Sequence, residues 1–302
     1  MTSENRIAAE IVSDKHEFRF TLADFRQICR LIYERAGIRL SESKTSMVYS
    51  RLSRRLRALG LATFAEYLQL LEQGVEAEWN IFIGSLTTHL TAFYREPHHF
   101  PIMVEHVAAR ARNGKALLWS CATSTGEEPY TMAIAVAEHF GSFNPPVRIL
   151  ATDVDTGVLE MASEGVYPLD RVRDLPEKTI KKYFLKGNGE HAGFVRVRPE
   201  LQQMIRFHQL NLLSPVWPMK EKYDAIFCRN VMIYFDRPTQ QKVLNKCLRH
   251  LKPDGLFFTG HSENLNYAAD LFQSCGNTVY RPRVLSPPQP VMDACGFREC
   301  RA

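Results

Sequence analysis

Apolar residues between about residues 20 and 86 recur every three or four positions, which is the period of a helix with one buried face. Glycines at positions 37, 60 and 74 divide this region, so the pattern predicts four consecutive helices. The first of them shows the period in Leu22, Phe25, Ile28 and Ile32. We therefore expect a small all-helical domain at the beginning of the chain.

After about residue 100 the pattern changes to short apolar runs that alternate with amphipathic stretches. The apolar runs predict strands at 115–121, 147–153, 204–211, 223–230 and 255–260. The amphipathic stretches predict helices at 129–140, 156–165 and 237–251, the last followed by a turn at "KPDG". Because strands that alternate with helices form a mostly parallel sheet covered on both faces, this part is predicted to be an α/β domain.

Composition narrows the class of protein. The 302 residues are 45% apolar, which is enough to fill a substantial core, and they carry a net charge of +5. No apolar run approaches the roughly 20 residues of a membrane span, and the polar N-terminus of mixed charge is unlike a secretory signal. Seven scattered cysteines without a CxxC pair favour reduced thiols and a cytoplasmic location. Cys121 and Cys228, at predicted strand ends, are interpreted as packing residues.

Polar side chains follow four successive predicted strands, which is where an open parallel sheet binds its ligands. The stretch "ATSTGEE" follows the first strand, and Asp153, Asn211 and Arg229 follow the next three. These strand ends offer carboxylates and few cations, which makes a poor binding site for a phosphate. They suit a ligand that carries ribose hydroxyls, an amino group and a positive centre. S-adenosylmethionine has these features, but the pattern does not separate it from other adenosine ligands. Each residue alone is also typical of a turn or a helix cap.

Six stretches, in order and with matching spacing from about residue 20 to residue 282, resemble the chemotaxis-receptor methyltransferase family, CheR. They are "SLTTHLTAFYREPHHFP", "WSCATSTGEEPY", "ATDVD", "FHQLNLL", "YDAIFCRNVMIYFD" and "LKPDGLFFTGHSEN". The resemblance implies transfer of a methyl group from S-adenosylmethionine to glutamate side chains of membrane chemoreceptors. It also implies a fold: an all-helical N-terminal domain, then a Rossmann-like α/β methyltransferase domain with a small antiparallel β-subdomain.

The resemblance divides the chain into segments. We expect a flexible leader at 1–17, the helical domain at 18–86 and an interdomain segment at 87–100 that contributes to the cofactor site. The methyltransferase domain is expected at 101–285, with its β-subdomain at about 184–203. Residues 286–302, with "SPPQP", are expected to form a disordered tail.

The resemblance also implies site residues. Those expected to contact the cofactor are His89, Thr91, Arg95, Glu128, Asp153, Asn211, Leu212, Arg229 and Asn230. Among them Asp153 is expected to hold the ribose, and Asn211 and Leu212 to border the adenine. Arg95 and Tyr234 are the expected catalytic residues, with Tyr234 near the transferred methyl group, and no metal is implied. His89 stands where the family usually has an asparagine.

A basic stretch without an acid runs from 43 to 59 and contains Lys44. Its arginines are Arg51, Arg54, Arg55 and Arg57. A solvated surface and a nucleic-acid patch are two interpretations; the resemblance favours a third, docking onto the acidic methylation helices of a receptor. We therefore expect chemoreceptors as partners, with no nucleic acid and no insertion into the membrane. The alternating "VRVR" at 195–198 resembles family members that also bind a receptor C-terminal peptide.

Two rival functions remain open from the residues. One is a regulatory module that binds the cofactor or a receptor peptide without turnover, and the other is a small-molecule O-methyltransferase. The stretch "GHSEN" at 260–264 brings His, Ser and Glu together, but adjacent residues rarely form a hydrolase triad, so a loop after a strand is predicted.

Overall fold

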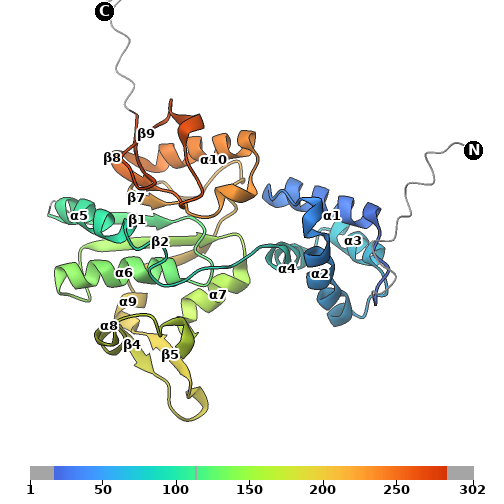
Figure 1. Cartoon of the computed structure of the whole chain (residues 1–302), viewed down its shortest axis with the longest axis horizontal. Helices are drawn as coiled ribbons and strands as arrows, with labels where there is room; N and C mark the ends of the chain where they lie inside the picture. The colour runs from blue at the N-terminus through green and yellow to red at the C-terminus, as the bar shows by residue number, and fades with distance from the viewer. Residues whose placement is uncertain (1–16, 113, 284–302) are drawn as a thin grey trace, which may run out of the picture.

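A computed structural model describes residues 17–112 and 114–283 of the chain. Figure 1 shows a helical unit beside a larger unit built on a sheet, with the chain crossing from one to the other after α4. Most of the predicted leader and all of the predicted tail lie outside the described residues. Among the described residues, no helix is long and apolar enough to cross a membrane.

The helical unit contains the four predicted α-helices. They are α1 (Leu22–Ala36), α2 (Thr45–Leu59), α3 (Phe64–Glu72) and α4 (Glu76–Leu86), with a short 3-10 turn at Glu42–Lys44 before α2. Gly37 and Gly60 end α1 and α2 with φ angles of 66° and 67°, a region that glycine enters without steric cost. Val48, Leu52 and Leu56 of α2 are completely buried, so the apolar face of this helix packs into the core.

The larger unit is built on a seven-stranded sheet with the order β6-β2-β1-β7-β8-β10-β9. The strands are β1 (Ala116–Ser120), β2 (Val147–Asp153), β6 (Ile205–Gln209), β7 (Tyr223–Phe227), β8 (Leu251–Phe258), β9 (Phe272–Ser274) and β10 (Val279–Pro282). The five strands from β6 to β8 are parallel, and β10 runs antiparallel to both β8 and β9. The predicted α/β class, with a mostly parallel sheet, is confirmed.

Both faces of the central strand β1 are buried. Leu118 and Trp119, neighbours in β1, have no exposed surface and enter two different apolar clusters. The helices of this unit are α5 (His99–Ala111), α6 (Glu127–Phe140), α7 (Thr156–Glu164) and α10 (Arg237–His250). The cluster around Leu118 includes side chains of α5 and α6, whereas the cluster around Trp119 includes side chains of α10. Polar groups of this sheet therefore gather where the strands end.

A second sheet has three antiparallel strands in the order β3-β5-β4 (Figure 1). They are β3 (Val166–Pro168), β4 (Phe184–Lys186) and β5 (Phe194–Val197), accompanied by α8 (Glu177–Tyr183) and α9 (Pro199–Gln202). The range expected for the β-subdomain, about 184–203, omits β3. The predicted alternation is present, since Val195 and Val197 are buried and Arg196 is exposed.

The turn predicted at 252–255 is wrong, because these residues do not form a separate turn. Residues 252–255 lie within β8, where they interrupt the pairing of β8 with β7. Tyr223 pairs with Leu251 and Ala225 pairs with Leu256, so four residues of β8 stand opposite Asp224 alone. The sequence "KPDG" therefore marks a bulge, because proline and glycine interrupt a strand ladder as readily as they form a turn. Helix α5, between 99 and 111, was not predicted.

Two histidines of α5 are held in the neutral form. His99 has no exposed surface, and the Nε2–H of His106 donates to the backbone carbonyl of Asp224 at 3.1 Å. Burial, reinforced by nearby arginines, lowers the pKa of each imidazole from 6.5 to about 4. Each group therefore favours the folded state fully above pH 6.5, and this contribution is lost as the pH falls towards 4.

We predict that the free energy of unfolding decreases by about 1.4 kcal/mol per pH unit for each of these histidines between pH 6 and pH 5. The change His106→Gln keeps a donor for the Asp224 carbonyl but cannot titrate, so it should make the pH profile of stability shallower. Urea denaturation of both proteins from pH 7 to pH 5 measures this. Parallel profiles would contradict the assignment of a buried neutral imidazole at 106.

Candidate active site

A cavity of about 860 Å³ lies between the helical unit and the carboxyl ends of the sheet. It is lined by all the residues predicted to contact the cofactor and by Tyr234: His89, Thr91, Arg95, Glu128, Asp153, Asn211, Leu212, Arg229, Asn230 and Tyr234. The structure therefore brings these residues together, although they come from segments up to 145 positions apart in the chain (234 − 89). A cavity of this size accommodates a nucleoside-sized ligand.

Polar contacts join the helical unit to the far wall of this cavity. The backbone N–H of Arg39 donates to the carbonyl of Tyr234 at 2.9 Å, and the Tyr33 hydroxyl donates to Asp236 at 2.6 Å. The amide nitrogen of Asn211 donates to the carbonyl of Arg35 at 2.7 Å. Asn211 thus lines the cavity, but its side-chain N–H₂ already serves the contact between the two units.

Asp153 ends β2 and is 7% exposed. Its Oδ2 accepts the backbone N–H of Ser124 at 2.8 Å, and its Oδ1 accepts that of Asp155 at 3.1 Å. Burial raises the pKa of this carboxyl group, and the two N–H donors oppose the increase. A carboxylate accepts about four hydrogen bonds, so lone pairs remain for the hydroxyls of a ribose.

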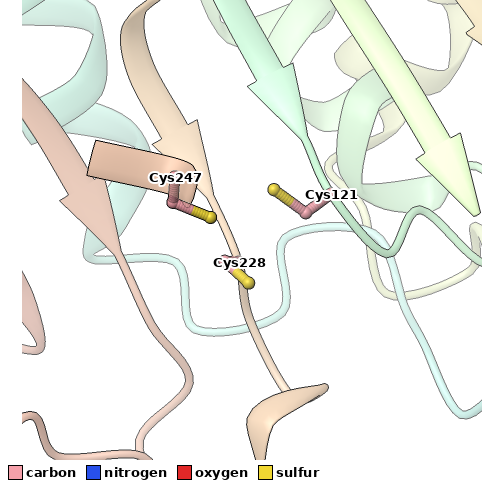
Figure 2. A group of neighbouring side chains, drawn as sticks. All are labelled: Cys121, Cys228 and Cys247. Atoms are coloured by element: carbon pink, nitrogen blue, oxygen red, sulfur yellow. The ribbon is translucent and has the colours of Figure 1, made fainter. Parts of the chain in front are cut away.

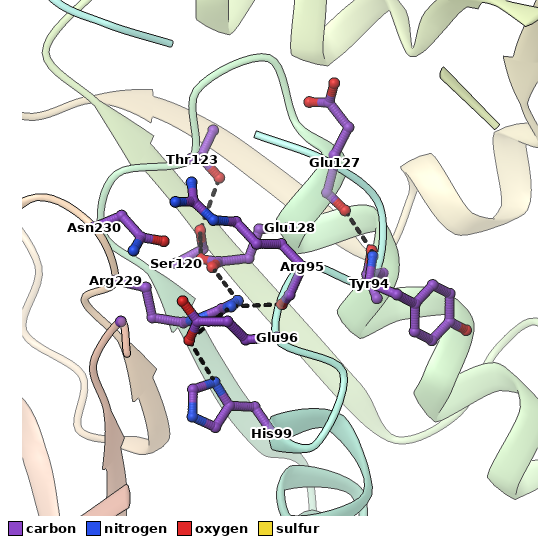
Figure 3. A network of polar contacts seen from close by, with 12 residues as sticks. Tyr94, Arg95, Glu96, His99, Ser120, Thr123, Glu127, Glu128, Arg229 and Asn230 are labelled. Atoms are coloured by element: carbon purple, nitrogen blue, oxygen red, sulfur yellow. Dashed lines mark hydrogen bonds and ion pairs between the residues drawn. The ribbon is translucent and has the colours of Figure 1, made fainter. Parts of the chain in front are cut away.

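Figure 3 shows a buried network in which the Arg229 guanidinium lies between two carboxylates. Arg229 contacts Glu128 at 2.8 Å and Glu96 at 3.3 Å, and it also donates to the backbone carbonyl of Arg95. Ser120 donates from its hydroxyl to the other oxygen of Glu128 at 2.7 Å. These contacts connect the ends of β1 and β7, the start of α6 and the segment between the two units.

The network carries one guanidinium against two carboxylates, so it has an excess of negative charge. Burial raises the pKa of Glu128, and Arg229 opposes this increase. Burial also raises the pKa of Glu96, but hydrogen bonds from His261 and the charge of Arg229 outweigh it and lower the value to about 2. Glu128 and Asp153 line the cavity and offer carboxylate oxygens to a cationic group of a ligand, and Arg95 and Arg229 line it as well.

The two acids of "GEEP" point in different directions (Figure 3). Glu128 lines the cavity, whereas Glu127 is completely buried elsewhere and pairs with Arg171 at 2.7 Å. Glu127 also accepts the Thr125 hydroxyl at 2.7 Å. Glu128, the acid that the family motif favours, is therefore the one that lines the cavity.

His89 is tied to a second acid that the sequence prediction did not include. Its Nε2 lies 3.0 Å from Asp155 Oδ2 and 2.7 Å from the Thr87 hydroxyl. Burial lowers the pKa of His89, but the hydrogen bond to Asp155 and the charges of Asp155 and Asp153 outweigh this and raise it. Asp155 also caps α7 by accepting the N–H of Gly157 at 2.8 Å.

Glu263 is another residue that the sequence prediction missed. It is 5% exposed and accepts backbone N–H groups from Asn230 and Gly260 at 2.7 Å and from Ile233 at 3.3 Å. It therefore fixes the turn that leads to Tyr234. A Cβ at position 260 would lie 2.3 Å from the side-chain nitrogen Nδ2 of Asn230, so only glycine allows this close approach. The predicted loop at 260–264 is present.

Strained backbone gathers around the same cavity. Tyr94, Glu96, Ser124 and Asn230 have φ angles of 54°, 55°, 51° and 57°. Residues other than glycine adopt this region at an energetic cost, and such residues cluster where a ligand site requires them. Composition and hydrophobic period carry no signal for these angles, so only the folded chain reveals them.

The four predicted arginines of α2 do not form one exposed surface, which corrects that expectation. Arg51, Arg54 and Arg55 line a shallow hollow together with His89. Arg51 donates to the carbonyls of Ser85 and Thr87, and Arg55 pairs with the buried Glu78. Arg57 lies outside the hollow and pairs with Glu17 at 3.0 Å.

Arg54 differs from its three neighbours. It is exposed, it lines the hollow, and the described part of the chain offers it no ion pair. The 3.6-residue period turns positions 51, 54 and 55 towards α4 and turns 57 away. Within the hollow, Arg51 is held by the carbonyls of Ser85 and Thr87 and Arg55 by Glu78, which leaves Arg54. Arg54 is therefore the arginine of α2 most available to a partner.

Comparison with known families gives two matches that together cover most of the chain. Residues 23–87 match the family described as "CheR methyltransferase, all-alpha domain". Residues 89–281 match the family described as "CheR methyltransferase, SAM binding domain". The second match includes every cavity residue predicted above.

Individual relatives are similar over almost their full length. The chain is 50% identical over 272 residues to "Chemotaxis protein methyltransferase 2" of Pseudomonas aeruginosa, which covers 90% of this chain and 97% of the relative. It is 51% identical over 265 residues to "Chemotaxis protein methyltransferase" of Salmonella typhimurium, covering 87% and 91%. Among solved structures, the glycopeptide N-methyltransferase MtfA with sinefungin aligns with a TM-score of 0.32 at 12% identity, over 57% of each chain.

The geometry around Asp153 generates a binding prediction. Replacing Asp153 with Ala removes the expected acceptor for the ribose hydroxyls and should weaken S-adenosylmethionine binding by about 1–3 kcal/mol, roughly 5- to 150-fold in Kd. Isothermal titration calorimetry measures this directly. Glu160→Ala, an exposed acid on α7, serves as the control and should bind like the parent. Unchanged affinity in a folded Asp153→Ala protein would contradict the assignment.

Proposed function

The chain belongs to the CheR methyltransferase family, and from this premise we propose that it methylates glutamate side chains of chemoreceptors with S-adenosylmethionine. It is a methyltransferase whose cofactor is S-adenosylmethionine and whose substrates are chemoreceptors. The observation that carries the proposal is the cavity beside the ends of β1, β2 and β7, which is lined by Asp153 and by Glu128 with its partner Arg229.

The residues of the cavity suit this cofactor. Asp153 offers acceptors for ribose hydroxyls, and Leu212 offers an apolar surface for the adenine. The excess of negative charge around Glu128 matches an ammonium and a sulfonium group. When bound, S-adenosylmethionine supplies an electrophilic methyl group, whose C–S bond breaks as a carboxylate oxygen of the receptor forms the new C–O bond.

The reaction needs no general base from the protein. The acceptor is a glutamate carboxylate with an ordinary pKa of about 4.3, so it is already ionised at neutral pH. The protein contributes by aligning the acceptor and by excluding water. We assign alignment to Arg95 and Tyr234, both half-buried at the cavity wall. Arg95 is held by its own contact to the Leu90 carbonyl at 2.6 Å.

Two surfaces are proposed to recognise the receptor. The hollow lined by Arg51, Arg54 and Arg55 lies next to His89 and so borders the cavity, which places positive charge where an acidic methylation helix would approach. The second surface is the small sheet. Its strand β5 is central, so a receptor C-terminal peptide would add to an edge, β3 or β4, rather than to "VRVR" itself.

Two finer expectations follow from the proposal. The protein would act in the cytoplasm, where receptor methylation segments lie, without inserting into the membrane. Of the two rival functions, the regulatory module would lack turnover and the small-molecule O-methyltransferase would lack a protein acceptor. The basic hollow beside the cavity favours a protein acceptor over a small molecule.

Methyl transfer to membranes that contain chemoreceptors tests the function. We predict that a labelled methyl group of S-adenosylmethionine becomes attached to receptor protein and is released by mild base, because it is held as a carboxyl ester. Membranes without chemoreceptors are the control. Label only in small molecules would support the small-molecule rival, and cofactor binding without any transfer would support the non-catalytic one.

A charge reversal tests receptor recognition. Arg54→Glu should raise KM for the receptor roughly two- to fivefold, since an exposed ionic contact contributes about 0.2–1 kcal/mol. The effect should fade as the salt concentration rises. Arg57→Glu, on the same helix but outside the hollow, is the matched control with a smaller expected effect. Both proteins should bind S-adenosylmethionine like the parent, and equal KM values for Arg54→Glu and the parent at low salt would overturn the assignment.

A further inference from the structure

Three cysteines converge in the core beside the cavity. Cys121 follows β1, Cys228 follows β7 and Cys247 lies in α10, so each comes from a different element (Figure 2). All three are at most 1% exposed. Their sulfur atoms all lie within 4.8 Å of one another. The interpretation of Cys121 and Cys228 as packing residues did not include Cys247, because nothing in the sequence brings position 247 near the other two.

The spacing of the sulfur atoms is close to that of a metal centre. A metal–thiolate bond of about 2.3 Å holds three sulfurs roughly 3.8–4.0 Å apart. The three thiols need to approach by less than about 1 Å to bind one ion, a shift that side-chain torsions can supply. No bond is needed between the thiols themselves, which are free in the structure.

The surroundings select the kind of ion. The cysteines belong to an apolar cluster that includes Trp119, Met232 and Leu244, which excludes water. Thiolates favour soft ions such as Cu(I) and zinc over hard ones. A closed zinc site requires four ligands, whereas the described residues offer only three sulfurs here. Cu(I) forms stable complexes with two or three thiolates, so three sulfurs complete its coordination.

We propose that Cys121, Cys228 and Cys247 form a binding site for one Cu(I) ion. Binding forms up to three Cu–S bonds and releases the protons of the thiols that become thiolates, with no change in oxidation state. The ion would join β1, β7 and α10 at the point where the first two strands meet the cavity. Cys121 itself lines that cavity, and Cys228 directly precedes Arg229.

The test uses the full chain with the other four cysteines, Cys29, Cys275, Cys295 and Cys300, changed to serine. This protein retains only the three clustered thiols and is titrated anaerobically with Cu(I) in the presence of bathocuproine disulfonate as a competing chelator. Because the thiols are buried, samples equilibrate overnight. We expect one Cu(I) per chain, near-ultraviolet absorbance from thiolate-to-copper charge transfer and a higher Tm, since an ion bound only by the folded state stabilises it.

Two variants of this protein remove one ligand each. Cys247→Ser and Cys228→Ala should lose at least tenfold in Cu(I) affinity and should show no copper-dependent rise in Tm. Their metal-free forms are checked for binding of S-adenosylmethionine, and the conclusion rests on whichever variant still binds it as its parent does. If both misfold, alkylation of the three thiols in the parent, followed by the same titration, should abolish copper binding.

Three results would overturn the proposal. The first is complete removal of Cu(I) from the three-cysteine protein by the chelator. The second is equal Cu(I) binding by a folded variant that lacks one of the three thiols. The third is tighter binding of Zn²⁺ than of Cu(I) in a competition between the two ions. That result would show that a set of three sulfur ligands does not select Cu(I) over zinc.

Discussion

The buried guanidinium of Arg229 is the interaction on which the site depends. It pairs with Glu128 at the start of α6 and with Glu96 in the segment between the two units, and it also binds the carbonyl of Arg95. A buried charge that loses its partner costs several kcal/mol, so these three segments cannot separate independently. The network thus keeps the segment that carries Arg95 against the sheet. It also leaves one carboxylate in excess for a cationic ligand.

The fold explains why this polar network lies at one edge of the molecule. Leu118 and Trp119 are buried on opposite faces of β1, so this central strand offers no polar surface along its length. The charged groups of the cavity gather beyond the strand ends, where helices begin and loops cross. Glu127 and Glu128 both follow Gly126, yet the first pairs with Arg171 and only the second reaches the cavity. The acids at this helix start therefore have protein partners of their own and leave no anion site.

The hydrophobic pattern was sufficient to predict the four helices of the first unit and the parallel sheet of the second, because both depend on periodic burial. Strand-end polarity and the family resemblance predicted the cavity residues from His89 to Tyr234. Glu263 and Asp155 were missed, because their roles depend on backbone N–H groups and on a histidine that only the folded chain brings near. The bulge in β8 was missed for a similar reason: "KPDG" is equally typical of a turn, and only pairing with β7 distinguishes the two.

His89 shows how one substitution can be absorbed by its surroundings. An asparagine at this position would offer an uncharged amide, whereas a histidine offers a ring nitrogen, and the hydrogen bond to Asp155 raises the pKa of His89. Asp155 supplies that acid at 3.0 Å and is itself held by the N–H of Gly157, so its carboxylate is already in place. The pair links residue 89, before the sheet, to the start of α7. The cavity wall is therefore fixed at two points, by the ion pairs of Arg229 and by the contact of His89 with Asp155, and Asp153, the proposed ribose acceptor, lies between them in the chain.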